Sequence, residues 1–386
     1  MFRRRVTTVS SQGGCSPPRH VFAGTEPATD PGSRCAFVRV AASRRIAISI
    51  WLLLAASIGH AQQTPRQGDA QPGRFACCSM ADARQLAAQP TSAQGSAATA
   101  SSRRFRTAAL LSGYAAAVGT YGYFSWWNKD VRRHVIAADG SVSEQTVANR
   151  TESFRVSHEG WFGHNTPDGG ADKLGHAFTS YVSTRLLASS LEHWGGQERK
   201  DAIWLAGLTA AGVSLAVEVL DGYTRDYGFS ATDLTMNLVG VGAGMLLESS
   251  SRWDDLIDLR WQYRRSADAK WLGERDPIAD YSGQTYLLVF KASGIPAFQS
   301  NRWLRFLEFQ VGYGSRGYSP HPGSFAPVQP RPHRNLYFGI GLNLSELLGA
   351  TVFGDSRGRA RRVTENVLEY LQVPGTNVLL RYGLDD

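Results

Sequence analysis

The sequence predicts an α+β fold, in which a membrane-associated bundle of about four helices is followed by a small antiparallel β-sheet of about five strands. Three observations lead to this fold class. Residues 105–251 contain uncharged segments of helical length, small residues recur at four-residue spacing within them, and from residue 259 onward apolar and polar side chains alternate. We therefore place a helical domain at 104–258 and a β-rich part, packed with it, at 259–386.

The first expected helix is uncharged along its whole length. Residues 107–127 are numerous enough to cross a bilayer, and they end in Trp126 and Trp127, which suit a membrane interface. Further helices are expected from about residue 172, over 202–220 and over 230–250. Acidic residues shorten the uncharged runs of the last two helices, which favours helices that are buried in protein.

Small residues indicate close packing between these helices. Gly207 and Ala211 in one helix, and Gly240 and Gly244 in the next, are spaced so that two helix backbones can approach each other. A tightly packed soluble bundle and a membrane-embedded bundle both explain the two pairs.

The β-rich part is recognised by its period of two. Leu259, Trp261 and Tyr263 alternate with polar residues, and the same alternation recurs over 335–344. The remaining strand candidates are 284–291, 303–313 and 376–382. A proline-rich loop is expected over 318–332, and a short amphipathic helix over 364–371.

The N-terminal region has the features of an export signal. Arg44 and Arg45 precede the apolar run 46–58, and small residues lead up to Ala61, as in a secretory signal peptide over 44–61 that is cleaved after Ala61. The run is short for an uncleaved membrane anchor. Residues 1–43 are interpreted as a leader from a start codon assigned too far upstream, and residues 62–103, rich in Gln, Ala, Ser and Pro, as a disordered linker.

Charge and cysteine content exclude some classes of protein. The net charge is +8, but residues 1–61 hold eight arginines and only two acidic residues, so the remainder is close to neutral and nothing favours nucleic acid binding. The four cysteines precede the expected domain, which therefore contains no disulfide framework. Cys77 follows Arg74-Phe75-Ala76, which is a poor processing site for a lipoprotein.

Polar groups inside the apolar helices are the candidate functional residues. Any one of them has a structural explanation, such as helix capping by Asp172 or Ser230. Together they favour a shared network, because ionisable groups are costly in apolar packing unless they are paired. That network is a candidate active site, cation site or internal ion-pair lock. The set is Asp172, Lys173, His176, Glu218, Asp221, Ser230, Asp233 and Asn237.

Distinct roles are expected within this set. If the set is an active site, His176 is the general acid or base. The carboxylates then orient His176 or hold a cation; they are Asp172, Glu218, Asp221 and Asp233. Lys173, Ser230 and Asn237 complete a structural polar network. A zinc site is disfavoured, because His176 is the one well-placed nitrogen ligand, and no resident cofactor is expected. A Ca²⁺ or Mg²⁺ ion would suit the carboxylate-rich ligands better.

Three motifs in the helical part resemble a known family. The segments 169–178 (GGADKLGHAF), 218–223 (EVLDGY) and 228–233 (GFSATD), with the later segments 280–284 and 335–344, are similar to the YfiM-like predicted periplasmic lipoproteins, a domain of unknown function. The resemblance covers about 105–385 and implies a periplasmic location. The motif DKxxH, followed by an acidic helix end, is more distantly similar to VanZ-like membrane proteins.

The sequence therefore predicts an exported cell-envelope protein, in the periplasm or on the periplasmic side of a bacterial membrane. A structural or interaction role is expected, with a membrane lipid or another envelope component as the partner. The alternative is a membrane-associated, hydrolase-like enzyme that acts on a lipid or cell-wall substrate through the polar set.

Overall fold

The structure is a computed structural model that describes residues 93–128, 130–136, 142–150, 153–271, 275–318, 332–354 and 358–385. The expected leader (1–43), signal peptide (44–61) and linker residues 62–92 lie outside the described residues, as does most of the proline-rich loop. The predicted α+β class is confirmed, with helices followed by a five-stranded antiparallel sheet.

The long helices are α2 (Ala93–Gly122), α3 (Ala171–His193), α4 (Arg199–Asp221) and α5 (Ala231–Ser249). Helix α3 begins where predicted, and α4 and α5 begin and end within a few residues of the predicted positions. Helix α2 begins earlier than expected, so residues 93–103 are helical where the composition predicted a disordered linker. Alanine favours the helix, and the apolar segment that follows extends it. The helix continues as a π-helical turn, η3 (Tyr123–Trp127).

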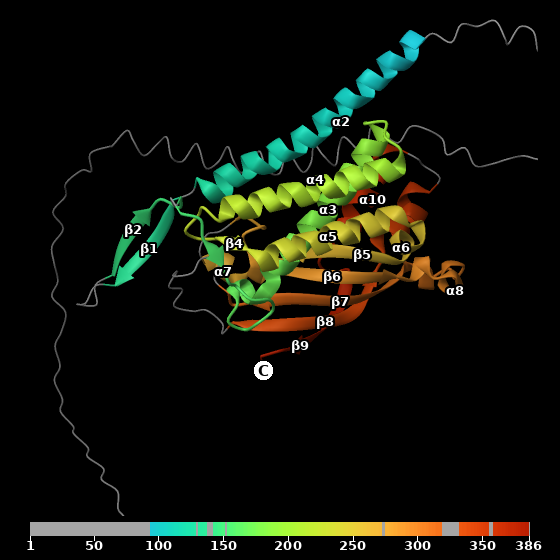
Figure 1. The fold of residues 1–386 in the computed structure, drawn as a ribbon. Helices are drawn as coiled ribbons and strands as arrows, with labels where there is room; N and C mark the ends of the chain where they lie inside the picture. Colours follow the sequence, from blue (N-terminus) through green and yellow to red (C-terminus); the bar gives the residue numbers. More distant parts are fainter. Residues whose placement is uncertain are drawn as a thin grey trace, which may run out of the picture. The chain divides into compact units, whose positions relative to one another are not determined.

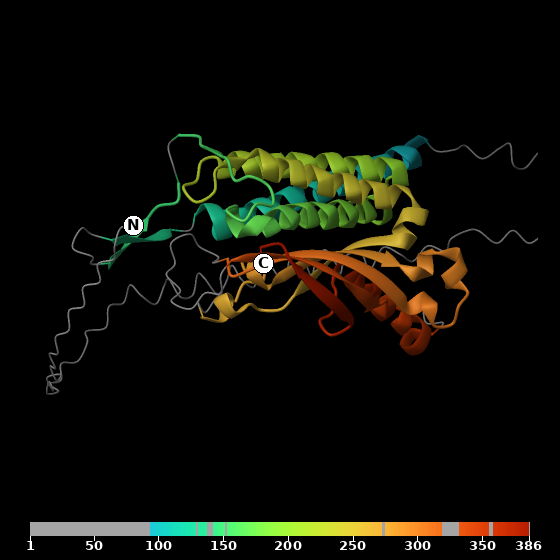
Figure 2. The ribbon, with the colours of Figure 1, turned by 90° about the horizontal axis from the view of Figure 1, so that it is seen from below.

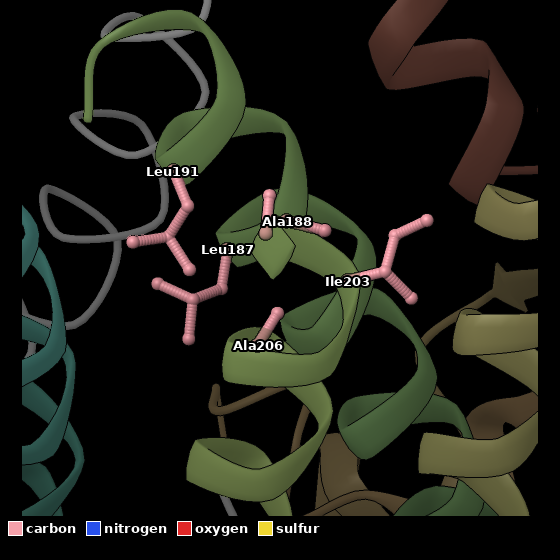
Figure 3. Close-up of a cluster of buried hydrophobic side chains, with 6 residues drawn as sticks. Leu187, Ala188, Leu191, Ile203 and Ala206 are labelled. Atoms are coloured by element: carbon pink, nitrogen blue, oxygen red, sulfur yellow. The ribbon is translucent and has the colours of Figure 1, made fainter. Parts of the chain in front are cut away.

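The core of the helical part lies between α3 and α4, at the end where α3 stops and α4 starts (Figure 3). Leu187 and Leu191 of α3 pack against Ile203 and Ala206 of α4, and apolar side chains of α2 cover this cluster. Small residues set the spacing between α3 and α5. An ideal Cβ added at Gly240 would lie 2.0 Å from the carbonyl oxygen of Ala177, so a glycine is required at this crossing.

Short elements lie between the long helices and between the strands of the sheet. The described short strands and helices are β1 (Val131–Ile136), β2 (Val142–Val147), β3 (Val156–Ser157), η4 (Pro167–Gly170), β4 (Phe229–Ser230), α6 (Ser251–Leu256), α7 (Ala267–Trp271), η5 (Tyr281–Gly283), η6 (Ala292–Gly294), α8 (Pro296–Gln299), η7 (Leu304–Phe306), α9 (Leu344–Leu348), η8 (Gly349–Phe353) and α10 (Arg359–Tyr370). Strands β1 and β2 form a hairpin, and β3 pairs in parallel with β4. The predicted amphipathic helix is α10, which begins five residues before the expected start.

The sheet has the order β5-β6-β7-β8-β9, and every neighbouring pair is antiparallel (Figure 1). Its strands are β5 (Ile257–Tyr263), β6 (Gln284–Lys291), β7 (Leu307–Arg316), β8 (His333–Leu342) and β9 (Asn377–Gly383). All five predicted strands are confirmed. Strand β7 starts four residues after the predicted start, because a turn of 3₁₀ helix precedes it.

The helices and the sheet lie in two layers, with the sheet's first strands against α3 (Figure 2). Phe178 of α3 packs against Tyr286 of β6, and Leu259 of β5 joins the same apolar cluster. The far side of the sheet curls. Leu371, just after α10, forms a β-bridge with Trp261 on the free edge of β5. Only six residues later β9 begins at the opposite edge of the sheet, so this chain segment brings the two edges near each other.

One helix among the described residues, α4, is long and apolar enough to cross a membrane, a test that a buried core helix can also pass. Residues 107–127, which are long enough to cross a bilayer, do not meet the same criterion of hydropathy. The segment carries no charge, but its many Gly, Ser, Thr and Tyr residues lower its hydropathy.

Candidate functional site

The start of α3 is held in an unusual backbone conformation. Asp168, Gly169 and Gly170 have φ values of 50°, 60° and 82°, so three successive residues lie in the left-handed region. A side chain at Gly170 would collide with the carbonyl oxygen of Trp161, 2.6 Å from an ideal Cβ. Gly170 is the N-cap and no side chain caps the helix, so Asp172 is free to take part in other contacts. This geometry excludes the simple capping explanation for Asp172.

Lys173 is the centre of the polar cluster. Its side chain is fully buried, and Nζ lies 2.5 Å from Glu159 Oε2, 2.8 Å from Asp172 Oδ2 and 2.7 Å from Asp233 Oδ1. Burial disfavours the ammonium, but Asp172 and Asp233 raise the pKa of Lys173 above its usual value. The lysine therefore stays charged and joins the start of α3, the start of α5 and the segment around residue 159.

A second group of contacts surrounds His176, one turn further along α3. His176 Nδ1 lies 3.8 Å from Glu218 Oε1, and Nε2 lies 3.8 Å from Asp233 Oδ1. Asn237 Nδ2 lies 3.3 Å from both His176 Nδ1 and Glu218 Oε1. Ser180 donates to Asn237 Oδ1 at 2.8 Å, which orients the amide. The His176 side chain is 28% exposed, whereas Glu218 and Asp233 are buried.

The predicted helix start at Ser230 is confirmed, and it also supports the cluster. Ser230 Oγ accepts a hydrogen bond from the amide of Asp233 at 3.2 Å. The Ser230 amide donates to Glu218 Oε2 at 3.4 Å. Ser157, which pairs with Ser230 across β3 and β4, donates to Glu159 Oε1 at 3.0 Å. The cap, the short strand pair and the carboxylates therefore form one hydrogen-bonded network.

Asp221 lies beside this network. Its Oδ1 accepts a hydrogen bond from Trp127 Nε1 at 2.6 Å, which joins the end of α4 to the π-helical turn after α2. Electrostatically it is close enough to His176 and Glu218 to influence both. The expectation that Asp221 approaches the other four catalytic candidates stays a prediction, and the hydrogen bond of its side chain is to Trp127.

The outer part of the cluster holds a proton near neutral pH. Burial raises the pKa of Glu218 to about 7, opposed by the nearby His176 imidazole. Burial also raises the pKa of Asp221 to about 6, against the hydrogen bond from Trp127. Burial alone would lower the pKa of His176, but Asp233 and Glu218 outweigh it and raise the pKa. Glu218 therefore gains a proton near pH 7 beside a histidine whose pKa is raised.

Two overlapping sets of side chains could hold a metal ion. His176, Glu218 and Asp233 offer ligand atoms within 4.8 Å of one another, as do Glu159, Asp172 and Asp233. The all-carboxylate set, which would suit Ca²⁺ or Mg²⁺, has the Lys173 ammonium within 2.8 Å of all three residues. The other set, one imidazole and two carboxylates, suits a transition metal better.

The sequence reasoning missed Glu159 and Ser180. Glu159 lies in an irregular segment fourteen residues before Lys173, and no spacing rule connects the two. Ser180 follows His176 by four residues, so its position on the same helix face could have identified it.

Asp172 Oδ1 is buried and has no hydrogen-bond partner among the described residues, and burial raises the pKa of this carboxyl despite the adjacent Lys173.

These features define an α+β protein with a buried, largely ion-paired cluster between three helices. Residues 158–249, which contain the described cluster, match the model of a family described as predicted periplasmic lipoprotein (DUF2279). The resemblance to the YfiM-like family is thereby confirmed over these residues, and so is the expected location, exported to the periplasmic side of a membrane. No curated protein and no solved structure matches the chain.

Proposed function

We propose that this protein is a membrane-associated component of the cell envelope with a structural or interaction role. It rests on membrane lipid through exposed apolar faces, and its polar cluster is an ion-pair lock that fixes α3, α4 and α5. The observation that supports this proposal best is the polarity of the sheet. Its outer face packs on α3 through Leu259 and Tyr286, and the same face continues across β7, β8 and β9 as exposed apolar side chains.

The register of β7, β8 and β9 aligns these apolar side chains in rows. Phe309 is opposite Ile340, which is opposite Val378; Val311, Phe338 and Leu380 form the next row. Val378 and Leu380 are 74% and 72% exposed. A soluble protein seldom exposes so large a continuous apolar surface, whereas contact with lipid would remove its cost.

Helices α4 and α5 carry further exposed apolar side chains. Leu208 and Trp204 of α4 are 66% and 55% exposed, and Val239 of α5 is 54% exposed. An interfacial helix buries such side chains at the boundary between headgroups and acyl chains. These faces support the same membrane association as the sheet.

The buried lysine supports the lock. Lys173 satisfies its charge with carboxylates from two helices and one connecting segment, and each of these contacts is 2.8 Å or shorter. Separating these elements would leave buried charges without partners, which costs several kcal/mol. The cluster therefore stabilises one arrangement of the helices.

Flotation with vesicles of phosphatidylethanolamine and phosphatidylglycerol tests the membrane association. Wild-type protein should float with the vesicles, and the double variant Leu208→Asp/Val378→Asp should remain at the bottom of the gradient. Ser300→Asp, which adds a charge at an exposed polar position, is the matched control and should float. Equal flotation of all three proteins, or of none, would reject the proposal.

A hydrolase-like enzyme acting on a lipid or cell-wall substrate is the second candidate, favoured by the accessibility of His176. Its imidazole is the more exposed member of a group that includes the buried acids Glu218 and Asp233. His176→Ala and Glu218→Gln separate the two candidates. For His176→Ala a lock predicts destabilisation by about 2–5 kcal/mol, because the buried Glu218 and Asp233 lose a partner. An active site predicts a stable fold and loss of an envelope phenotype, with the exposed His158→Ala as the control.

A further inference from the structure

The inner side of the curled sheet contains a cavity of about 480 Å³ at the end opposite to α8 and α9. Thirteen residues line it, and none of them is acidic. Arg264 follows β5, Arg316 ends β7 and Arg381 lies on β9, so three separate strands bring arginines to one cavity. We call this space the arginine cavity. Its neutral polar lining includes Gln262, Asn335 and Asn377.

Arg316 is held in place by neutral groups. Nη1 donates to the carbonyl oxygens of Gln284 at 2.9 Å and Ser315 at 2.6 Å, and Nη2 donates to Thr285 Oγ1 at 2.8 Å. The guanidinium also lies 5.9 Å from the ring centre of Tyr337. Burial lowers the pKa of this arginine. The group is fixed and partly desolvated, and its hydrogen-bond acceptors among the described residues carry no charge.

The acidic residues near the cavity have other partners. Asp280 accepts hydrogen bonds from Tyr263 Oη at 3.1 Å and from the Ser266 amide at 2.8 Å. Deeper in the curl, Arg260 Nη2 lies 2.6 Å from Asp258 and 2.8 Å from Glu308, so that these charges are paired among themselves. The Asp280 carboxylate also favours the charged form of Arg316. Among the described residues no carboxylate forms an ion pair with the three cavity arginines, so their positive charge can attract an anionic ligand.

We propose that the arginine cavity binds the phosphate of a phosphomonoester, with Arg316 as its fixed contact and Arg264 and Arg381 closing on it from the rim. Planar guanidinium groups pair with two phosphate oxygens at once, and three of them match a dianion better than a single carboxylate. The phosphate can come from a lipid headgroup or from a soluble molecule.

Calorimetric titration of the full chain in mild detergent tests this proposal with two probes, inorganic phosphate and short-chain phosphatidic acid. The double variant Arg264→Gln/Arg381→Gln removes two exposed charges and keeps the fixed Arg316. It should weaken binding about tenfold or more, since a hydrogen bond to a charged group contributes about 1.5–3 kcal/mol. Arg252→Gln, an exposed arginine on α6, is the matched control and should bind as the wild type does.

The two probes distinguish the sources of the phosphate. Binding of both identifies a site for free or esterified phosphate, and binding of phosphatidic acid alone identifies a lipid headgroup site; each requires weakening in the double variant. Wild-type protein that binds neither probe overturns the proposal. Equal affinities of the double variant and the Arg252→Gln control overturn it as well, because the interaction is then a general effect of positive charge.

Discussion

Lys173→Met is the most direct test of the polar cluster. Methionine has nearly the length of lysine, so the substitution removes the ammonium and leaves most of the volume. Glu159, Asp172 and Asp233 then lose the cation that lies within 2.8 Å of each of them. We expect the free energy of unfolding at pH 7 to fall by about 3–5 kcal/mol, the cost of removing one partner from a buried ion pair.

The pH dependence gives a second, independent signature. The Lys173 pKa is raised, so the wild-type ammonium stays charged throughout the accessible range. In the variant the stranded carboxyl groups should take up protons, which means that their pKa values in the folded state rise above those of the unfolded chain. Such groups favour the folded state at low pH and lose that contribution as pH increases. The stability difference should therefore be smaller at pH 5 than at pH 8.

Urea unfolding of the detergent-solubilised protein, followed by tryptophan fluorescence and circular dichroism, measures both effects. Lys200→Met, at an exposed position on α4, is the control and should change stability by less than about 0.5 kcal/mol. Adding Asp172→Asn to Lys173→Met should recover part of the loss, because it removes one unpaired charge. A loss below about 1 kcal/mol at pH 7, or a loss that is independent of pH, would refute the ion-pair lock.

Three further predictions concern other parts of the molecule. Gly240→Ala should destabilise the fold by about 1–3 kcal/mol by forcing α3 and α5 apart, whereas Gly242→Ala, with open space around it, should be neutral or stabilising in the same unfolding assay. The raised Glu218 pKa means that stability falls, on the order of 3 kcal/mol, as pH rises from about 4.5 to about 7, and Glu218→Gln should flatten this dependence. N-terminal sequencing of envelope-derived protein should begin near Gln62, and a product that retains residues 1–61 would exclude the proposed cleavage.

Strands β5 and β8 were predictable from sequence because the two faces of each strand differ in burial. The alternation around Leu259 and over 335–344 follows directly from the pleat of β5 and β8. Helices α3, α4 and α5 were predictable because their apolar runs have clear ends, such as the Ser230 cap. The start of α2 was not, since an alanine-rich segment without an apolar period can be a linker or a solvated helix, and packing further along the chain decides between them.

The candidate site was predictable in its members but not in its arrangement. Helix spacing placed Asp172 and His176 on one face, and the cost of buried charge predicted that such groups would meet. The central position of Lys173 and the contribution of Glu159 depend on how a segment without regular structure packs onto α3. The local sequence pattern does not distinguish Asp221 from Asp233. In the structure Asp221 accepts a hydrogen bond from Trp127, whereas Asp233 contacts Lys173.

The polarity of the sheet limits which environment suits this fold. Period-two alternation indicates that the two faces of a strand differ, but it does not indicate which face is buried. The usual assignment of apolar residues to the buried face is wrong for β7. There Glu308 and Gln310 are buried, whereas Phe309 is 48% exposed. Arg260 pairs with Glu308 and Asp258, so the buried charges are compensated and the inward-facing polar side is stable as it is. For the sheet in water, the cost lies on the outer face, where apolar rows on β7, β8 and β9 remain uncovered. A lipid surface against that face is the environment that removes this cost without requiring any rearrangement of the paired charges within.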